Sequence, residues 1–195
     1  MHKNLKMKHI FYLMLFLPSL LFSQSDDCFY YMNVSTDSIS IKVLNEEVMY
    51  ERIYGNSEEI VLFKLLNNDG VPIVNVQLLQ KNTDFIPTNC FNKSSKIVFQ
   101  LVNGKIVTLH SITEDNCGIL SYEEKEKINT RLLDGYFAFA KNNYEELKKS
   151  PISLMRIQFV GQAKEYVINS VIESEFHNKI YYPENIFVSF LKCIE

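Results

Sequence analysis

The sequence predicts an α+β domain in which antiparallel β-hairpins form a twisted sheet with two or three short helices, including a C-terminal helix. Segments that alternate polar and apolar residues, separated by turn residues, predict the hairpins. Pro183 suits the first turn of a helix, and the apolar residues behind it recur at helical spacing. These residues are Ile186, Phe187, Phe190 and Leu191. Strands therefore come first along the chain and helices later.

The first predicted strands cover residues 38–44 and 48–54. Residues 38–44 alternate polar and apolar side chains, and 48–54 continue in residues that favour strands. Residues 60–66 and 71–79 are predicted to pair as a hairpin, because the asparagines, aspartate and glycine at 67–70 favour a turn.

A second hairpin is predicted at 96–110, where Asn103-Gly104 separates two β-rich arms. This dipeptide tolerates the positive φ angles of a two-residue hairpin turn. A loop of two residues would place one set of cross-strand pairs on a mostly apolar face that points at the core. The predicted pairs are Leu101 with Ile106, Phe99 with Thr108 and Ile97 with His110.

The segment 116–134 is predicted to be either a short helix or a loop. Ser121 and Glu124 have the spacing of a capping box, which favours a helix, whereas Gly118 and Gly135 bracket the segment as they would a loop. The remaining predicted elements are a strand at 136–140, a short helix at 144–149 that begins after Asn143, and a hairpin of 154–159 with 164–168.

Residues 1–23 have the features of a secretory signal peptide. Lys3, Lys6 and Lys8 precede an apolar stretch at 10–22, which is shorter than the roughly 20 residues that cross a membrane. Small residues at 23 and 25 suit cleavage between these positions. The sequence therefore predicts a single exported domain at 24–195, in the periplasm, outside the cell or at the cell surface.

The predicted domain is acidic. The chain has 20 basic and 23 acidic residues, and the signal peptide removes three lysines, which leaves 17 − 23 = −6. An acidic surface without a basic cluster repels phosphate backbones, so nucleic acid is excluded as a partner. No segment after the signal peptide is apolar over a length that spans a membrane, so no integral membrane segment is expected.

All four cysteines lie after the predicted signal peptide, as expected for two disulfides in an oxidising compartment. Three pairings are possible. We favour Cys90 with Cys117, which closes a local loop, and Cys28 with Cys193, which ties together the two ends of the domain. The spacings match no CxxC redox motif and no paired zinc motif.

Short motifs occur at the end of the signal peptide, at the start of the domain, in the central hairpin and near the C-terminus. They are Leu21-Phe22-Ser23-Gln24, Asp27-Cys28-Phe29-Tyr30, residues 97–104, residues 147–149 with 155–157, and Phe190-Leu191-Lys192-Cys193-Ile194. In these motifs the chain resembles small exported proteins of Bacteroidetes bacteria. No activity is established for that group, so the resemblance implies a secreted β-rich domain and brings no catalytic residue.

The sequence offers little material for catalysis. It has no nucleophile elbow, phosphate-binding loop or dinucleotide fingerprint, so we predict no cofactor and assign no catalytic residue. Glu173, Glu175 and His177 alternate and would share one face of a strand, which makes them candidate metal ligands. The polar residues that follow favour a solvated surface segment instead.

Two functional classes remain open. The first, which we favour, is an exported non-enzymatic module that binds a protein or a small ligand of unknown identity. The aromatic pairs Tyr30-Tyr31 and Tyr181-Tyr182 suit a contact surface, although aromatic residues also favour strands and cores. The alternative is a small secreted hydrolase that uses His177 with nearby carboxylates.

Overall fold

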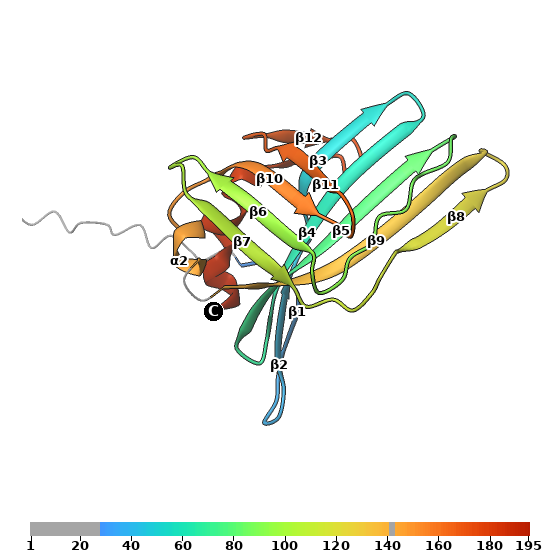
Figure 1. Cartoon of the computed structure of the whole chain (residues 1–195). Coiled ribbons are helices and arrows are strands. Elements are labelled where there is room, and N and C mark those ends of the chain that lie inside the picture. The colour runs from blue at the N-terminus through green and yellow to red at the C-terminus, as the bar shows by residue number, and fades with distance from the viewer. Residues whose placement is uncertain (1–27, 141–142) are drawn as a thin grey trace, which may run out of the picture.

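Antiparallel strands build most of the molecule. The computed structural model describes residues 28–140 and 143–195, so the predicted signal peptide at 1–23 lies outside the described residues. Within these ranges, eleven strands form one sheet and two further strands form a separate hairpin (Figure 1).

The elements follow one another in this order. The strands of the first half are β1 (Tyr30–Ser35), β2 (Ser40–Leu44), β3 (Glu47–Tyr54), β4 (Ser57–Asn68), β5 (Val71–Asn82), β6 (Lys96–Leu101) and β7 (Ile106–Ser111). The second half contains β8 (Ile119–Glu123), β9 (Ile128–Phe139), α2 (Tyr144–Leu147), β10 (Ile152–Gln158), β11 (Ala163–Val167), β12 (Ile172–Ser174) and β13 (Lys179–Tyr181). The chain ends with the 3₁₀ turn η2 (Pro183–Asn185), α3 (Ile186–Phe190) and the 3₁₀ turn η3 (Leu191–Ile194).

The predicted α+β class is wrong, because the sheet dominates the fold. Within the described residues, α2 and α3 span four and five residues, whereas β4, β5 and β9 span twelve each. Neither α-helix has a side-chain hydrogen bond at its N-cap, so Asn143, which precedes the predicted helix at 144–149, does not cap it through its side chain. None of the helices in the described ranges has the length and apolar character needed to cross a membrane.

Residues 116–134 are neither the helix nor the loop that the sequence allowed. They form β8 and the first half of β9, and β9 pairs with β5 from Asn129 opposite Asn82 to Ala138 opposite Ile73. This long-range pairing outweighs the local capping-box signal. Gly118 lies where the chain meets β9: its φ is +70°, and a Cβ atom there would lie 2.4 Å from the Leu132 carbonyl oxygen.

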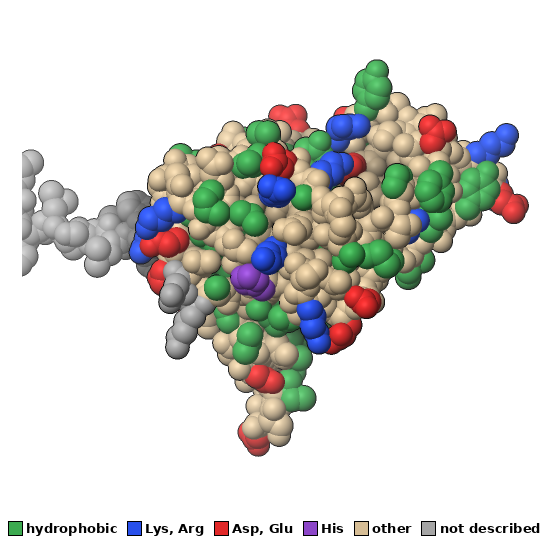
Figure 2. Space-filling model, in the orientation of Figure 1, with side chains coloured by type: hydrophobic (Ala, Val, Ile, Leu, Met, Phe, Trp, Pro, Cys, Tyr) green, Lys and Arg blue, Asp and Glu red, His purple; other side chains and the backbone are tan. Residues whose placement is uncertain are grey.

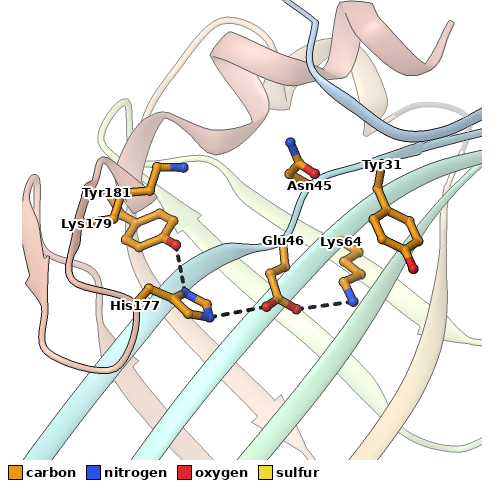
Figure 3. Close-up of a pocket in the computed structure, with 7 residues that line it drawn as sticks. All are labelled: Tyr31, Asn45, Glu46, Lys64, His177, Lys179 and Tyr181. Atoms are coloured by element: carbon orange, nitrogen blue, oxygen red, sulfur yellow. Dashed lines mark hydrogen bonds and ion pairs between the residues drawn. The ribbon is translucent and has the colours of Figure 1, made fainter.

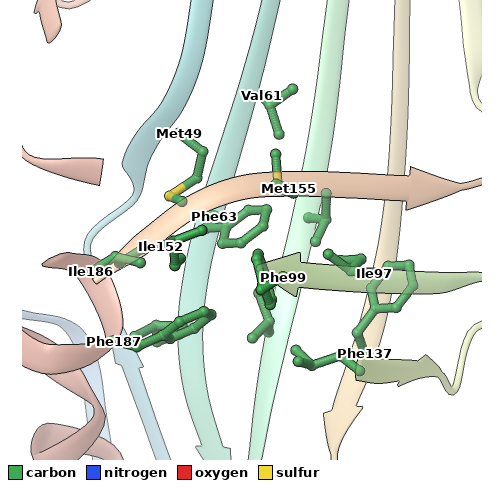
Figure 4. Close-up of a cluster of buried hydrophobic side chains, with 14 of the residues drawn as sticks. Met49, Val61, Phe63, Ile97, Phe99, Phe137, Ile152, Met155, Ile186 and Phe187 are labelled. Carbon is green, nitrogen blue, oxygen red and sulfur yellow. The ribbon is translucent and has the colours of Figure 1, made fainter. Parts of the chain in front are cut away.

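Two of the three long strands, β4 and β9, have a divided edge. One edge of β4 pairs with β3 along its first half and with β2 at its end, and one edge of β9 pairs with β8 and then with β7. Two branches therefore leave each divided edge. The branch that continues as β7-β6-β10-β11 folds over the long strands, so that β6 and β10 cross β4 and β5 (Figure 4).

The main core fills the space between the folded branch and the long strands. Phe63 of β4 contacts Phe99 of β6, with ring centroids 6.2 Å apart, and Phe99 contacts Phe187 of α3 at 5.2 Å (Figure 4). Met155 of β10 is fully buried beside them. Each such side chain contributes about 1.5–3 kcal/mol on burial, so α3 is fixed by the core that it helps to form.

The predicted hairpin of β6 and β7 is present, but its register is shifted by one residue. The Leu101 N–H donates to the Lys105 carbonyl, and the Gly104 N–H donates to the Leu101 carbonyl, both at 2.9 Å. The loop therefore has three residues, with Gly104 at a φ of +83°. Because a one-residue shift exchanges the faces of a strand, His110 pairs with Lys96 and is exposed, not directed at the core.

The predicted C-terminal helix is present as the succession of η2, α3 and η3, and it closes one end of the core. Its last carbonyl groups accept hydrogen bonds from side chains of other elements, which satisfies groups that a helix end leaves unpaired. Tyr30 Oη donates to the Cys193 carbonyl at 2.9 Å, and Asn67 Nδ2 donates to the Ile194 carbonyl at 2.6 Å.

Two disulfides form in the pairing that we favoured. Cys28 is bonded to Cys193, which links the residues before β1 to η3. Cys90 is bonded to Cys117, which links the loop between β5 and β6 to the residues before β8. Next to the second bond, Phe91 and Asn116 exchange two backbone hydrogen bonds, so the disulfide reinforces a contact that the backbone also makes.

Acidic and basic side chains are mixed over the face of the molecule seen in Figure 1. Figure 2 shows acidic, basic and apolar side chains mixed across this face.

The hairpin of β1 and β2 projects from the body at the bottom of the view (Figure 1). The exposed aliphatic residues on it include Val34 and Ile39.

We predict that removing the bond between Cys28 and Cys193 lowers the free energy of unfolding by about 2–5 kcal/mol, because this link restricts nearly the whole unfolded chain. The variants Cys28→Ser and Cys193→Ser should lose similar stability in urea unfolding. The double variant should lose little more than either, since each single change breaks the same bond. A double variant that loses the sum of the two single losses in free energy of unfolding would contradict the pairing. Peptide mapping under non-reducing conditions that finds Cys28 joined to Cys90 would contradict it as well.

Candidate functional site

The candidate metal ligands Glu173, Glu175 and His177 lie in the hairpin of β12 and β13. They do not share one face of a strand, because β12 ends at Ser174 and residues 175–178 form the turn. Among the described residues, no group of three or more histidine, cysteine, aspartate or glutamate side chains lies close enough to hold a metal ion. The structure therefore brings His177 to other partners.

Glu51 of β3 anchors this turn. Its carboxylate accepts hydrogen bonds from the hydroxyl of Ser174, from the Glu175 N–H at 2.7 Å and from the Phe176 N–H at 3.3 Å. The Ser174 hydroxyl in turn accepts a hydrogen bond from the His177 N–H at 3.1 Å. Backbone N–H groups of a turn need acceptors, and here a single charged side chain supplies them.

Apolar contacts hold the same hairpin on the outer face of the sheet. Tyr181 of β13 packs with Val48 of β3 and with Ile60 and Leu62 of β4 in a second, smaller buried cluster. This face is opposite to the one that carries the main core, because successive side chains of a strand alternate between faces. The hairpin is thus fixed to the sheet by both apolar packing and the Glu51 hydrogen bonds.

A cavity of about 400 Å³ opens beside the hairpin (Figure 3). Its lining comes from elements that are far apart in the sequence. Tyr31 belongs to β1, Asn45 and Glu46 connect β2 to β3, Lys64 belongs to β4, His177 lies in the turn, and Lys179 and Tyr181 belong to β13. The cavity exists because β1, β4 and the hairpin meet around the segment that joins β2 to β3.

Three contacts join the polar side chains of the cavity into a chain (Figure 3). The Tyr181 hydroxyl lies 2.7 Å from His177 Nδ1, and His177 Nε2 lies 3.3 Å from Glu46 Oε1. Glu46 Oε2 lies 3.2 Å from Lys64 Nζ. Both ring nitrogens of His177 are therefore occupied by protein groups.

The environment of Tyr181 indicates how protons are placed in this chain. Burial and the negative charges of Glu47, Glu46 and Glu51 together raise the pKa of Tyr181 to about 12. The phenol keeps its proton at neutral pH and shares a hydrogen bond with His177 Nδ1, in which the donor is set by the tautomer of the histidine ring. In the tautomer whose Nδ1 accepts this bond, the ring proton lies on Nε2, which faces Glu46 Oε1 at 3.3 Å.

Lys179 differs from Lys64 in its partners. Its ammonium lies 4.7 Å from the centroid of the Tyr181 ring, a cation–π geometry. In the described part of the chain, no carboxylate lies within 4.0 Å of it. Burial raises the pKa of the neighbouring Glu47, and Lys179 lowers it in part. The cavity thus contains an ammonium group that no carboxylate neutralises by direct contact.

Sequence reasoning identified His177 and missed its partners. Glu46 and Lys64 carry no signal in the sequence, because neither residue lies near His177 along the chain. The tyrosine pairs were a partial signal. One member of each pair, Tyr31 and Tyr181, lines the cavity.

No protein-family model, curated protein or solved structure significantly matches the chain. The resemblance to exported Bacteroidetes proteins therefore stays a prediction.

We predict that Glu51→Ala destabilises the protein by about 1.5–3 kcal/mol, because it leaves the Ser174 hydroxyl and two N–H groups without their charged acceptor. Glu173→Ala is the matched control, since Glu173 is an exposed glutamate of the same hairpin. Its effect should stay within about 0.5 kcal/mol in urea unfolding. Equal losses in the two variants would show that Glu51 does not anchor the turn.

We also predict that a chelator of divalent ions leaves the melting temperature unchanged within error, because Glu173, Glu175 and His177 are not arranged as a ligand set. Thermal unfolding followed by circular dichroism checks this. A decrease of several degrees that zinc reverses would instead assign these residues as ligands.

Proposed function

We propose that the chain is an exported, non-enzymatic binding module that works in the periplasm or at the cell surface and holds its ligand in the cavity around His177. Two disulfides, which persist in oxidising compartments, support export. The described helices, none of which could cross a membrane, are compatible with it.

The observation that carries the proposal is the convergence of polar side chains from β1, β4 and the anchored hairpin in one cavity. Its volume of about 400 Å³ lies in the range of small-ligand sites. Glu46, Lys64, His177 and Tyr181 hold one another in place before any ligand arrives. Polar groups that are preorganised in this way reduce the entropy lost on binding.

The same contacts argue for binding over catalysis. A general base needs a free nitrogen directed at the substrate, and both nitrogens of His177 are engaged by Tyr181 and Glu46. No serine, threonine or cysteine lines the cavity within the described residues. The four cysteines are all in disulfides, so none can act as a nucleophile.

A small secreted hydrolase is the alternative, and one observation favours it. One ring nitrogen of His177 lies against a carboxylate, as the oriented histidine of a hydrolytic triad does, and the other lies against the Tyr181 phenol. It would have to release Glu46 or Tyr181 to take a proton from water. The alternative can therefore be tested with a variant of His177.

Affinity capture with matched variants tests the proposal. Immobilised wild-type protein is incubated with an extract of the native envelope fraction, and eluted small molecules and proteins are identified by mass spectrometry. Tyr31→Ala changes the exposed rim of the cavity, whereas Tyr122→Ala changes another exposed tyrosine, which lies in β8 and does not line the cavity. We expect a component that wild type and Tyr122→Ala retain and Tyr31→Ala loses.

Two outcomes would contradict the proposal. Identical recovery from all three proteins would show that the cavity is not the site. Turnover of chromogenic esters or glycosides that His177→Gln abolishes would favour the hydrolase.

A further inference from the structure

A second cavity adjoins the first and has a different character. Its volume is about 370 Å³, and its apolar lining comes from Phe29, Leu44 and Phe190. It shares Asn45 and Lys179 with the cavity around His177. A polar and an apolar compartment therefore meet at these two residues.

The apolar compartment is open to a ligand. Phe29 is 69% exposed, so a large aromatic side chain stands at its edge in contact with water. Leu44 is buried and Phe190 packs against the main core, so the inner wall is rigid. An apolar group bound there would remove the exposed surface of Phe29 from water, which is favourable.

Lys179 places a positive charge at the junction of the two cavities. Glu46 contacts both Lys64 and His177, so its negative charge is engaged within the first cavity. Burial disfavours the charged form of Glu47, the acidic residue that lines the second cavity. Lys179 belongs to both linings, and its ammonium is the group at the junction left to pair with a ligand.

We propose that the two cavities form one site for an amphipathic anion, whose apolar part packs against Phe29, Leu44 and Phe190 and whose negatively charged group binds Lys179. This inference rests on the proposed binding function. A cationic ligand of the same shape would be repelled by Lys179. A neutral one would gain the apolar contacts alone.

Calorimetric titration of the purified protein with octanoate, octylammonium and octanol tests the inference, because the three probes share a chain and differ in charge. Octanoate should bind at least about tenfold more tightly than octylammonium, as expected for one charge-assisted contact. Lys179→Gln should weaken octanoate binding by about tenfold and leave octanol binding unchanged. Phe29→Ser should weaken octanoate and octanol binding alike.

Lys125→Gln is the matched control, since Lys125 lies in the turn between β8 and β9 and lines neither cavity. It should bind all three probes as the wild type does. Co-sedimentation with phosphatidylglycerol vesicles separates the two sources of such an anion. Retention on vesicles that Lys179→Gln abolishes identifies a membrane lipid, and octanoate binding without retention identifies a free acid.

The outcomes separate this inference from the proposed function. Equal loss of octanoate binding in Lys179→Gln and Lys125→Gln, or no binding of octanoate, would overturn the amphipathic anion as the ligand class. Preferred binding of octylammonium that Tyr31→Ala removes would also overturn it, while the cavity remained a binding site. Loss of the captured component in Tyr31→Ala, as described above, concerns the proposed function alone.

Discussion

The rest of the structure depends on the pairing of three twelve-residue strands, β4, β5 and β9. Their neighbours are shorter, so one edge of β4 and one edge of β9 must each be shared by two strands. A sheet divided in this way cannot remain a single flat layer. One branch folds over the long strands and encloses the main core, and the opposite face of β4 is left for the hairpin of β12 and β13.

The C-terminal third of the chain therefore contacts both faces of the sheet. Phe187 enters the main core, whereas Tyr181, a few residues earlier, packs on the outer face against Val48 and Ile60. The bond between Cys28 and Cys193 then fixes η3 beside the start of β1. In this arrangement β1, β4 and the hairpin surround Glu46, and the polar cavity follows from the topology of the sheet.

The sequence predicted what local chemistry determines. The hairpins at 60–79 and 154–168 were found, because their turn residues and alternation lie within one short segment. The strands within residues 116–134 were not predicted, because their structure depends on pairing with β5, which is far away in the chain. The prediction that His110 points at the core was wrong, because the loop has one more residue than predicted and this reverses the two faces of the strand. The alternation of polar and apolar residues does not reveal the length of the loop.

The central claim is that His177 positions the polar groups of a binding cavity and is not a free base. Long-range ¹H–¹⁵N correlation spectra of histidine-labelled protein test it, recorded at about pH 8.5, where an ordinary histidine is neutral. We expect a proton on His177 Nε2 and a hydrogen-bonded, unprotonated Nδ1, with the Nδ1 signal shifted in Tyr181→Phe. A proton on Nδ1 together with an unprotonated Nε2 that the Tyr181→Phe change does not affect would contradict the account.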